Sequence, residues 1–193
     1  MGRIKHSRKI NFKPLYKKFA PTDKGTTGTT HLLDEEMEAL YLMDILELYQ
    51  EEAAKKMEIS RPTFTRILKN ARVKLTTALV SGHSINIEDH RDFTIVAICG
   101  DDETFKNIQN NRKFIFIYSV SKEDTTLVNK ILNPISSSED KPATILPQIL
   151  IENNVDLFIS CKIGEGIKNT LISKGIEPLV KEKIELKELA YLL

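Results

Sequence analysis

Residues 59–81 of this 193-residue chain contain five Lys or Arg and no acidic residue. Lysine and arginine on one face of a helix neutralise DNA phosphates, and arginine can also read guanine in the major groove. We therefore predict that this segment binds double-stranded DNA. The side chains expected on its outward face are Arg61, Thr65, Arg66, Lys69, Asn70, Arg72 and Lys74.

The surrounding residues predict two short helices that meet at a tight turn near residue 58. Ser60 can accept a hydrogen bond from the free N–H groups that open the second helix, and Pro62 is tolerated in that first turn. Two helices joined in this way, with the second one basic, are typical of a helix-turn-helix unit. An ordinary helical hairpin with a solvated basic face is the alternative. The apolar residues at inward-facing spacing are Ala53, Ala54, Met57, Phe64, Ile67 and Leu68.

The turn itself carries Glu58, where glycine is often preferred. A non-glycine residue in this position costs up to about 1 kcal/mol if its φ angle is positive. We expect the turn to tolerate that cost.

Charge is separated along the first third of the chain. Residues 1–24 contain eight Lys or Arg and one acid, whereas residues 34–58 contain nine acids and two lysines. Such separation indicates a polyanionic partner for the basic arm. We predict that the arm adds phosphate or minor-groove contacts through Arg3, Lys5, Arg8 and Lys9.

The pattern changes after residue 90. Residues 34–80 have helical spacing, residues 81–92 form a turn-rich joint with a short strand at most, and later segments alternate between strands and helices. This alternation favours a mixed or parallel sheet layered with helices. We predict an α+β protein of two domains: an all-α domain at residues 1–90 and an α/β domain with a mixed sheet at residues 91–193.

Three residue pairs in the second half could form a site. Gly164 and Gly166 follow a predicted strand and open a helix, so backbone N–H groups there could hold an anion; a tight turn is the alternative. Cys99 and Cys161 each end a predicted strand and could form a soft-metal or redox pair, although buried free cysteines are common. Asp101 and Asp102 could bind Mg²⁺, but a turn also explains them.

The composition excludes several classes of protein. Two distant cysteines do not form a secreted disulfide framework, and no apolar run approaches the roughly 20 residues that a membrane span needs. The basic N-terminus lacks the apolar core of a signal peptide. We find no catalytic motif and no close metal-ligand cluster, so we expect a cytoplasmic protein that is not an enzyme.

The first half of the chain resembles an uncharacterised prokaryotic family of predicted DNA-binding proteins. The segments "GRIKHSRKI", "FAP" and "SRPTFTRIL" carry the resemblance, which covers residues 1–90. It implies a helix-turn-helix similar to region 4 of sigma factors. Glu58 departs from the family pattern, and so does Tyr41, where arginine is expected.

The second half resembles the dinitrogenase iron–molybdenum cofactor biosynthesis domain. The segments "TIVAICGDD", "KFIFIYSV" and "VDLFISCKIGEGIKN" carry this resemblance, which covers residues 93–193. It implies a ribonuclease-H-like α/β fold and binding of an iron–sulfur or iron–molybdenum cluster. The family has a His-Phe-Gly segment before the second strand; the aligned stretch here is Ile108–Asn110, which lacks the histidine.

The leading interpretation is a DNA-binding transcriptional regulator whose second domain senses a ligand or mediates association. Because a single helix-turn-helix usually reads DNA as a dimer, we predict a homodimer. The alternatives are a carrier or scaffold for a metal cluster and a ribonuclease-H-like enzyme acting on nucleic acid.

Overall fold

The computed structural model describes residues 8–136 and 142–192. The chain divides into two compact units, Met1–His90 and Arg91–Leu193. Each unit has its own hydrophobic core. No helix in the described ranges is both long and apolar enough to cross a membrane.

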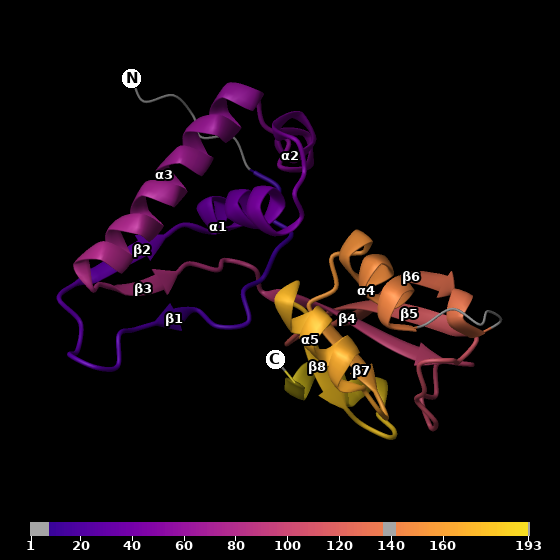
Figure 1. Ribbon diagram of the computed structural model, residues 1–193. Coiled ribbons are helices and arrows are strands. Elements are labelled where there is room, and N and C mark those ends of the chain that lie inside the picture. Colours follow the sequence, from indigo (N-terminus) through magenta and orange to yellow (C-terminus); the bar gives the residue numbers. More distant parts are fainter. Residues whose placement is uncertain (1–7, 137–141, 193) are drawn as a thin grey trace. The chain divides into compact units, whose positions relative to one another are not determined.

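Among its described residues, the N-terminal unit contains three α-helices and one π-helical turn, whose arrangement Figure 1 shows. Helix α1 (Asp34–Leu40) continues directly into η1 (Tyr41–Ile45), and α2 (Gln50–Lys56) and α3 (Arg61–Ser81) follow. The inward faces of these helices form one cluster, as the apolar spacing predicts. Its buried members include Ala39, Leu42, Ala53, Ala54, Met57, Phe64, Ile67, Leu68 and Ala71.

A four-residue connection separates α2 from α3. Met57 ends α2, and Ser60 is the N-cap of α3, where its hydroxyl accepts a hydrogen bond from the backbone N–H of Thr63 at 3.4 Å. Pro62 lies in the first turn of α3, where the missing N–H breaks no helical bond. At its other end, α3 stops at Gly82, which adopts a left-handed conformation with φ +67°.

Glu58 has φ +55° in this connection, which is the left-handed region that favours glycine. Changing Glu58→Gly is therefore expected to raise the free energy of unfolding of the N-terminal unit by about 0.5–1 kcal/mol. Chemical denaturation followed through this unit measures the change. Glu58→Ala is the matched control, because it removes the same carboxylate but keeps the Cβ atom. Equal free energies of unfolding for the two variants would contradict the idea that the left-handed backbone at residue 58 is strained.

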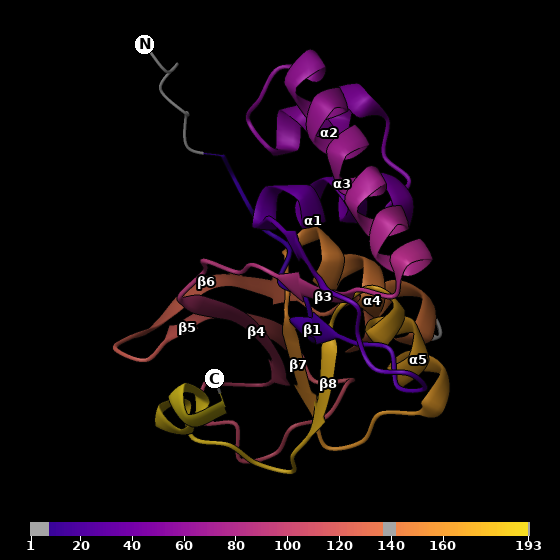
Figure 2. The same cartoon turned by 90° about the vertical axis from the view of Figure 1, so that its left-hand side faces the viewer.

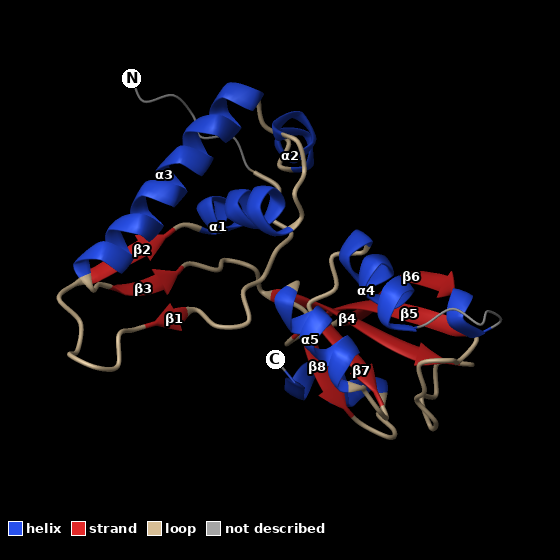
Figure 3. Cartoon of the chain, in the orientation of Figure 1, coloured by secondary structure: helices blue, strands red, loops and turns tan. Residues whose placement is uncertain are grey.

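The prediction of an all-α first domain is wrong, because this unit also contains a three-stranded sheet (Figure 3). The strands are β1 (Lys18–Phe19), β2 (Thr29–Leu32) and β3 (Ser84–Ile87). Central β3 pairs antiparallel with β1 and parallel with β2. Strand β3 lies where the sequence allowed a short strand, but β1 and β2 were not predicted, because strands of two to four residues that pair across more than fifty positions leave no local periodicity.

The C-terminal unit is built on a five-stranded mixed sheet in the order β6-β5-β4-β7-β8. Strand β5 runs antiparallel to its two neighbours β4 and β6, whereas β4, β7 and β8 run parallel. The strands are β4 (Phe93–Gly100), β5 (Phe114–Ser121), β6 (Thr125–Leu132), β7 (Leu157–Ser160) and β8 (Glu177–Val180).

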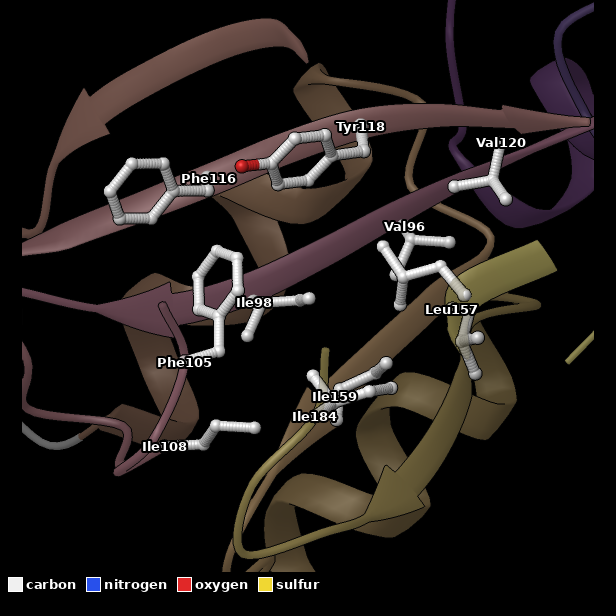
Figure 4. Packing of buried hydrophobic residues seen from close by; sticks show 11 residues of the cluster. Val96, Ile98, Phe105, Ile108, Phe116, Tyr118, Val120, Leu157, Ile159 and Ile184 are labelled. Carbon is white, nitrogen blue, oxygen red and sulfur yellow. The ribbon is translucent and has the colours of Figure 1, made fainter. Parts of the chain in front are cut away.

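Helices cover this sheet on both faces (Figure 2). On one face, α4 (Pro142–Glu152) and α5 (Glu165–Ser173) pack through Leu146, Leu150 and Leu171. On the other face, the 3₁₀ helix η3 (Leu186–Leu192) and the loop after β4 close a second cluster (Figure 4). A short 3₁₀ turn, η2 (Pro134–Ser136), follows β6. The unit is thus a layered α/β structure with a mixed sheet, as predicted.

Candidate nucleic-acid interface

Helix α3 is amphipathic, and its exposed face is basic. Phe64, Ile67 and Leu68 are buried in the core, whereas Arg66, Lys69 and Asn70 are exposed. Across the described residues 8–136 and 142–192, neither Arg66 nor Lys69 takes part in an ion pair. Lys69 and Asn70 follow Arg66 by three and four residues, so the three side chains lie on one side of the helix.

The other three cations of α3 are paired with acids of α1, η1 and α2. Arg61 and Arg72 form ion pairs whose partners are all largely exposed, so either cation can exchange its partner for a phosphate at little cost. Lys74 differs, because its partner Glu36 is only 5% exposed and needs a counter-charge. We therefore leave Lys74 out of the interface. The pairs are Arg61 Nη1–Glu51 Oε1 at 2.9 Å, Arg72 Nη2–Asp44 Oδ1 at 2.5 Å and Lys74 Nζ–Glu36 Oε2 at 2.7 Å.

Thr65 connects α3 to α2. Its hydroxyl lies 3.1 Å from Oε1 of Gln50 and 3.0 Å from the backbone oxygen of Arg61, and it can donate to either. Thr65 is exposed beside Arg66. The contact fixes the start of α2 against the first turn of α3 and thereby helps to orient the basic face.

The basic N-terminal arm lies partly against the helices. Arg8 forms an ion pair with Glu35, and both side chains are largely buried. Burial lowers the pKa of the Arg8 guanidinium below its ordinary value, and the positive charge of Arg66 lowers it further. Arg8 therefore neutralises a buried carboxylate and is unavailable as a free phosphate contact.

Residues that follow Arg8 hold the arm in place. The carboxylate of Glu38 accepts hydrogen bonds from the backbone N–H groups of Asn11 at 3.0 Å and Phe12 at 2.6 Å. The Phe12 ring stacks on Tyr41 at a centroid distance of 4.1 Å. These roles for the acids of α1 were not predicted from the sequence; the run of glutamates is the signal that could have suggested them.

The remaining arm residues divide into two groups. The backbone N–H of Lys9 donates to Met57 O at 3.3 Å, and its exposed ammonium lies 3.6 Å from the carboxylate of Glu58. Lys9 thus stands beside the turn that precedes α3. Arg3 and Lys5 lie outside the described residues.

Gly164 and Gly166 lie at the start of α5, as predicted. Gly164 is the N-cap, and Gly166 is the second residue of the helix. A Cβ atom added at either position would meet nothing within 4 Å. Neither position requires glycine for packing within the described part of the chain, and anion binding there stays a prediction.

Cys99 and Cys161 lie at the same end of two parallel neighbouring strands, β4 and β7. The last paired residues are Ile98 and Ile159; Cys99 follows Ile98 by one residue and Cys161 follows Ile159 by two, so the two cysteines are out of register by one residue. Cys99 is fully buried, and burial raises the pKa of its thiol to about 12. Because metals bind the thiolate, this environment disfavours a metal ligand at Cys99.

The described donors do not fit the cluster that the family resemblance implies. No group of three His, Cys, Asp or Glu side chains able to hold a metal occurs among residues 8–136 and 142–192. Asn110, in the segment that lacks the histidine, instead joins neighbouring loops. Its side-chain nitrogen donates to the backbone oxygen of Lys162 at 3.1 Å, and its side-chain oxygen accepts from the Ser160 hydroxyl. Its backbone oxygen accepts from the side-chain nitrogen of Asn133 at 2.7 Å.

Asp101 and Asp102 serve the loop after β4. Asp101 accepts hydrogen bonds from Arg112 Nη1 at 3.0 Å and from the backbone N–H of Lys113 at 3.1 Å. The hydroxyl of Thr104 donates to Asp102 at 2.5 Å and lowers the pKa of that carboxyl. Both carboxylates thus have structural partners, which agrees with the turn explanation.

Two family models match successive parts of the chain. The model described as "Protein of unknown function DUF134" matches residues 1–94, and the model described as "Dinitrogenase iron-molybdenum cofactor" matches residues 94–190. The match of a solved structure, a putative NifB protein from Thermotoga, covers 51% of this chain and 84% of that one, with 19% identity and a TM-score of 0.38.

Curated relatives match the first half. A UPF0251 protein of Caldicellulosiruptor saccharolyticus is 46% identical over 88 residues, which are 46% of this chain and 63% of the relative. A UPF0251 protein of Clostridium novyi is 39% identical over 112 residues, which are 56% of this chain and 76% of the relative. The chain thus spans less than two thirds of the first relative's length. It belongs to the UPF0251 family through its first half and to the dinitrogenase iron–molybdenum cofactor family through its second half.

Proposed function

We propose that the chain is a DNA-binding transcriptional regulator in which α2 and α3 form a helix-turn-helix. In this proposal α3 enters the major groove and presents Arg66, Lys69 and Asn70 to the duplex. The observation that carries the proposal is the exposed face of α3, which has no acid along its full length and two cations, Arg66 and Lys69, that form no ion pair among the described residues.

The charge arrangement supports this orientation. Four acids of α1, η1 and α2, namely Glu35, Glu36, Asp44 and Glu51, neutralise cations of α3 and of the arm. Arg61 and Arg72 flank Arg66 and Lys69 in exposed ion pairs that phosphates can replace. Binding of a duplex would therefore engage up to four cations of one helix, with Lys9 beside them.

A homodimer completes the proposal. One helix-turn-helix contacts a short half-site, and two copies reading paired half-sites supply the specificity of a regulator. We assign the C-terminal unit to ligand sensing or to association, with no catalytic role, and we place the protein in the cytoplasm with its DNA.

Changing Arg66→Ala is expected to weaken binding to a specific site by about 1–3 kcal/mol and to relax sequence preference, if Arg66 contacts a base. Changing Lys69→Ala is expected to weaken binding to all sequences equally and to reduce the slope of log K against log salt by about 0.9. Fragments selected from genomic DNA supply the site, and fluorescence anisotropy at several salt concentrations measures the affinities.

Lys168→Ala, an exposed lysine of α5, is the control for loss of one positive charge and is expected to leave affinity unchanged. Unchanged DNA binding in both α3 variants would show that the assigned face is wrong.

A metal-cluster carrier is the second candidate, because residues 94–190 match the family named for the iron–molybdenum cofactor. The donor set argues against it, since Cys99 is buried as a neutral thiol. The candidate requires stoichiometric metal in protein purified without oxygen. A ribonuclease-H-like enzyme is the third candidate and requires Mg²⁺-dependent cleavage that Asp101→Asn or Asp102→Asn abolishes.

A further inference from the structure

Strand β6 forms one edge of the five-stranded sheet, and six of its eight residues are exposed. Its exposed residues include three large apolar ones: Leu127 at 38%, Val128 at 58% and Leu132 at 63%. The opposite edge, β8, has only four residues and contains Pro178, which has no N–H to donate. Because a long apolar edge strand is a template for another strand, β6 is the edge at which the sheet can be extended.

The pairing of β6 with β5 shows which of its backbone groups point away from the sheet. At the turn, the N–H of Ser121 donates to Asp124 O at 2.8 Å, and at the other end the N–H of Asn133 donates to Lys113 O at 2.9 Å. In an antiparallel pair, such bonded positions alternate with positions whose N–H and C=O point outward. Counted along the register from both ends, the outward residues of β6 are Thr125, Leu127, Lys130 and Leu132.

These outward groups have no further strand to pair with among residues 8–136 and 142–192. The N–H of Lys130 donates to the side-chain oxygen of its own neighbour Asn129 at 2.9 Å, which agrees with its outward direction. The edge is therefore open to a strand of another chain.

A β-bulge makes the spacing of this edge irregular. The register pairs Tyr118 with Leu127 and Ile117 with Asn129, so Val128 is an extra residue in β6. The outward residues consequently follow one another at steps of two, three and two positions. A regular strand has outward groups at every second residue and loses register at the step of three. The bulge thus protects the edge against ordinary strands, as bulges on edges commonly do.

A second copy of β6 has the matching spacing. Steps of two, three and two read the same in both directions, so an antiparallel copy brings each outward residue opposite another outward residue. Thr125 then faces Leu132 of the second copy, and Leu127 faces its Lys130. No two like charges are opposed, which would destabilise the pair. The twofold axis passes between residues 128 and 129, so the contact closes on itself as a dimer.

We propose that two copies of the chain associate through antiparallel pairing of their β6 strands, which joins the two five-stranded sheets into one. The inference names the contact surface of the homodimer in the proposed function and rests on that function for its use in DNA reading. A strand pair is a small interface, so we expect the free dimer to dissociate reversibly. Paired half-sites on one duplex would then hold the two copies together.

The register is tested by cross-linking the full chain with Cys161 changed to serine. Positions 127 and 130 of opposite copies exchange backbone hydrogen bonds, which places their Cα atoms about 5.5 Å apart, within the range that a disulfide spans. Within one copy the same positions lie roughly 10 Å apart along the strand, which is too far for a disulfide. The double variant Leu127→Cys with Lys130→Cys is expected to form a covalent dimer with a thiol oxidant, seen on a non-reducing gel. Either single cysteine variant is the control and is expected to stay monomeric over the same time.

The association itself is tested by sedimentation equilibrium of the full chain without DNA. Leu127→Lys places a like charge opposite Lys130 of the second copy, whereas Leu127→Glu places an opposite charge there. Because the contact occurs twice in the dimer, the dissociation constant is expected to be about tenfold or more higher for the lysine variant than for the glutamate variant. High salt is expected to reduce the difference. Val180→Lys changes an exposed apolar residue of the other edge strand and is expected to leave the constant unchanged.

The proposal is overturned if the chain is monomeric at the highest concentration in the centrifuge, if the double cysteine variant cross-links no faster than the single ones, or if the lysine and glutamate variants associate equally. These measurements contain no DNA and therefore do not depend on α3. A dimer that failed to bind DNA would refute the regulator function and leave the β6 contact intact. Binding of paired half-sites by a chain that fails these tests would support the regulator and refute the β6 contact.

Discussion

Changing Phe64→Ala is expected to lower the free energy of unfolding of the N-terminal unit by about 3–5 kcal/mol. Phe64 has 0% exposure and lies in the cluster that joins α2 to α3, where Ala53 and Met57 are also fully buried. Alanine would remove the ring and leave a cavity that two rigid helices cannot close. The basic face of α3 would lose its fixed position, so DNA binding is expected to fall together with stability.

Hydrogen exchange of the amides of α2 and α3 measures this effect, because it reports on one unit of a two-unit chain. Val73→Ala is the matched control: it shortens an apolar side chain of the same helix that is 56% exposed, and it is expected to change stability by less than about 0.5 kcal/mol. Similar effects of the two variants would mean that the ring of Phe64 does not hold α2 and α3 together.

Changing Asp156→Ala is expected to lower the free energy of unfolding of the C-terminal unit by about 3–5 kcal/mol. One carboxylate oxygen lies 2.9 Å from Nη2 of Arg91, and the other accepts the backbone N–H of Ile95 at 2.8 Å. Both charged side chains are largely buried. The variant would remove the carboxylate from the buried guanidinium of Arg91 and the acceptor from the backbone N–H of Ile95 in the central strand β4.

A double-mutant cycle with Arg91→Met measures the coupling by chemical denaturation. The double variant is expected to be more stable than the sum of the single changes predicts, because it leaves no buried charge unpaired. Lys187→Ala removes a partner of the exposed Glu185 and is expected to leave the stability nearly unchanged, as is usual on a surface. Simple additivity of Arg91→Met and Asp156→Ala would refute the coupling.

Much of the C-terminal unit can be predicted from its sequence. Segments rich in β-branched and aromatic residues became the buried strands β4 and β5, and the segment at Leu157–Ser160 became the parallel strand β7. Such strands are recognised because burial on both faces demands a continuous apolar run. The one-residue offset between Cys99 and Cys161 depends on strand register, which the two segments alone do not reveal.

In the N-terminal unit the sequence by itself determined the elements that are set by neighbouring residues. The serine cap at Ser60, the proline in the first turn and the apolar spacing of Phe64, Ile67 and Leu68 all act within one or two helical turns. The positive φ of Glu58 follows from the same local geometry.

Only the tertiary structure decided which cations are free. Arg8, Arg72 and Lys74 find acidic partners 27, 28 and 38 positions away, and three strands pair over similar or longer separations. The physical reason is that an ion pair or a backbone ladder depends on distance in space, which the folded core sets. Composition showed that the segment is basic, but the fold left Arg66 and Lys69 as its exposed, unpaired charges among the described residues.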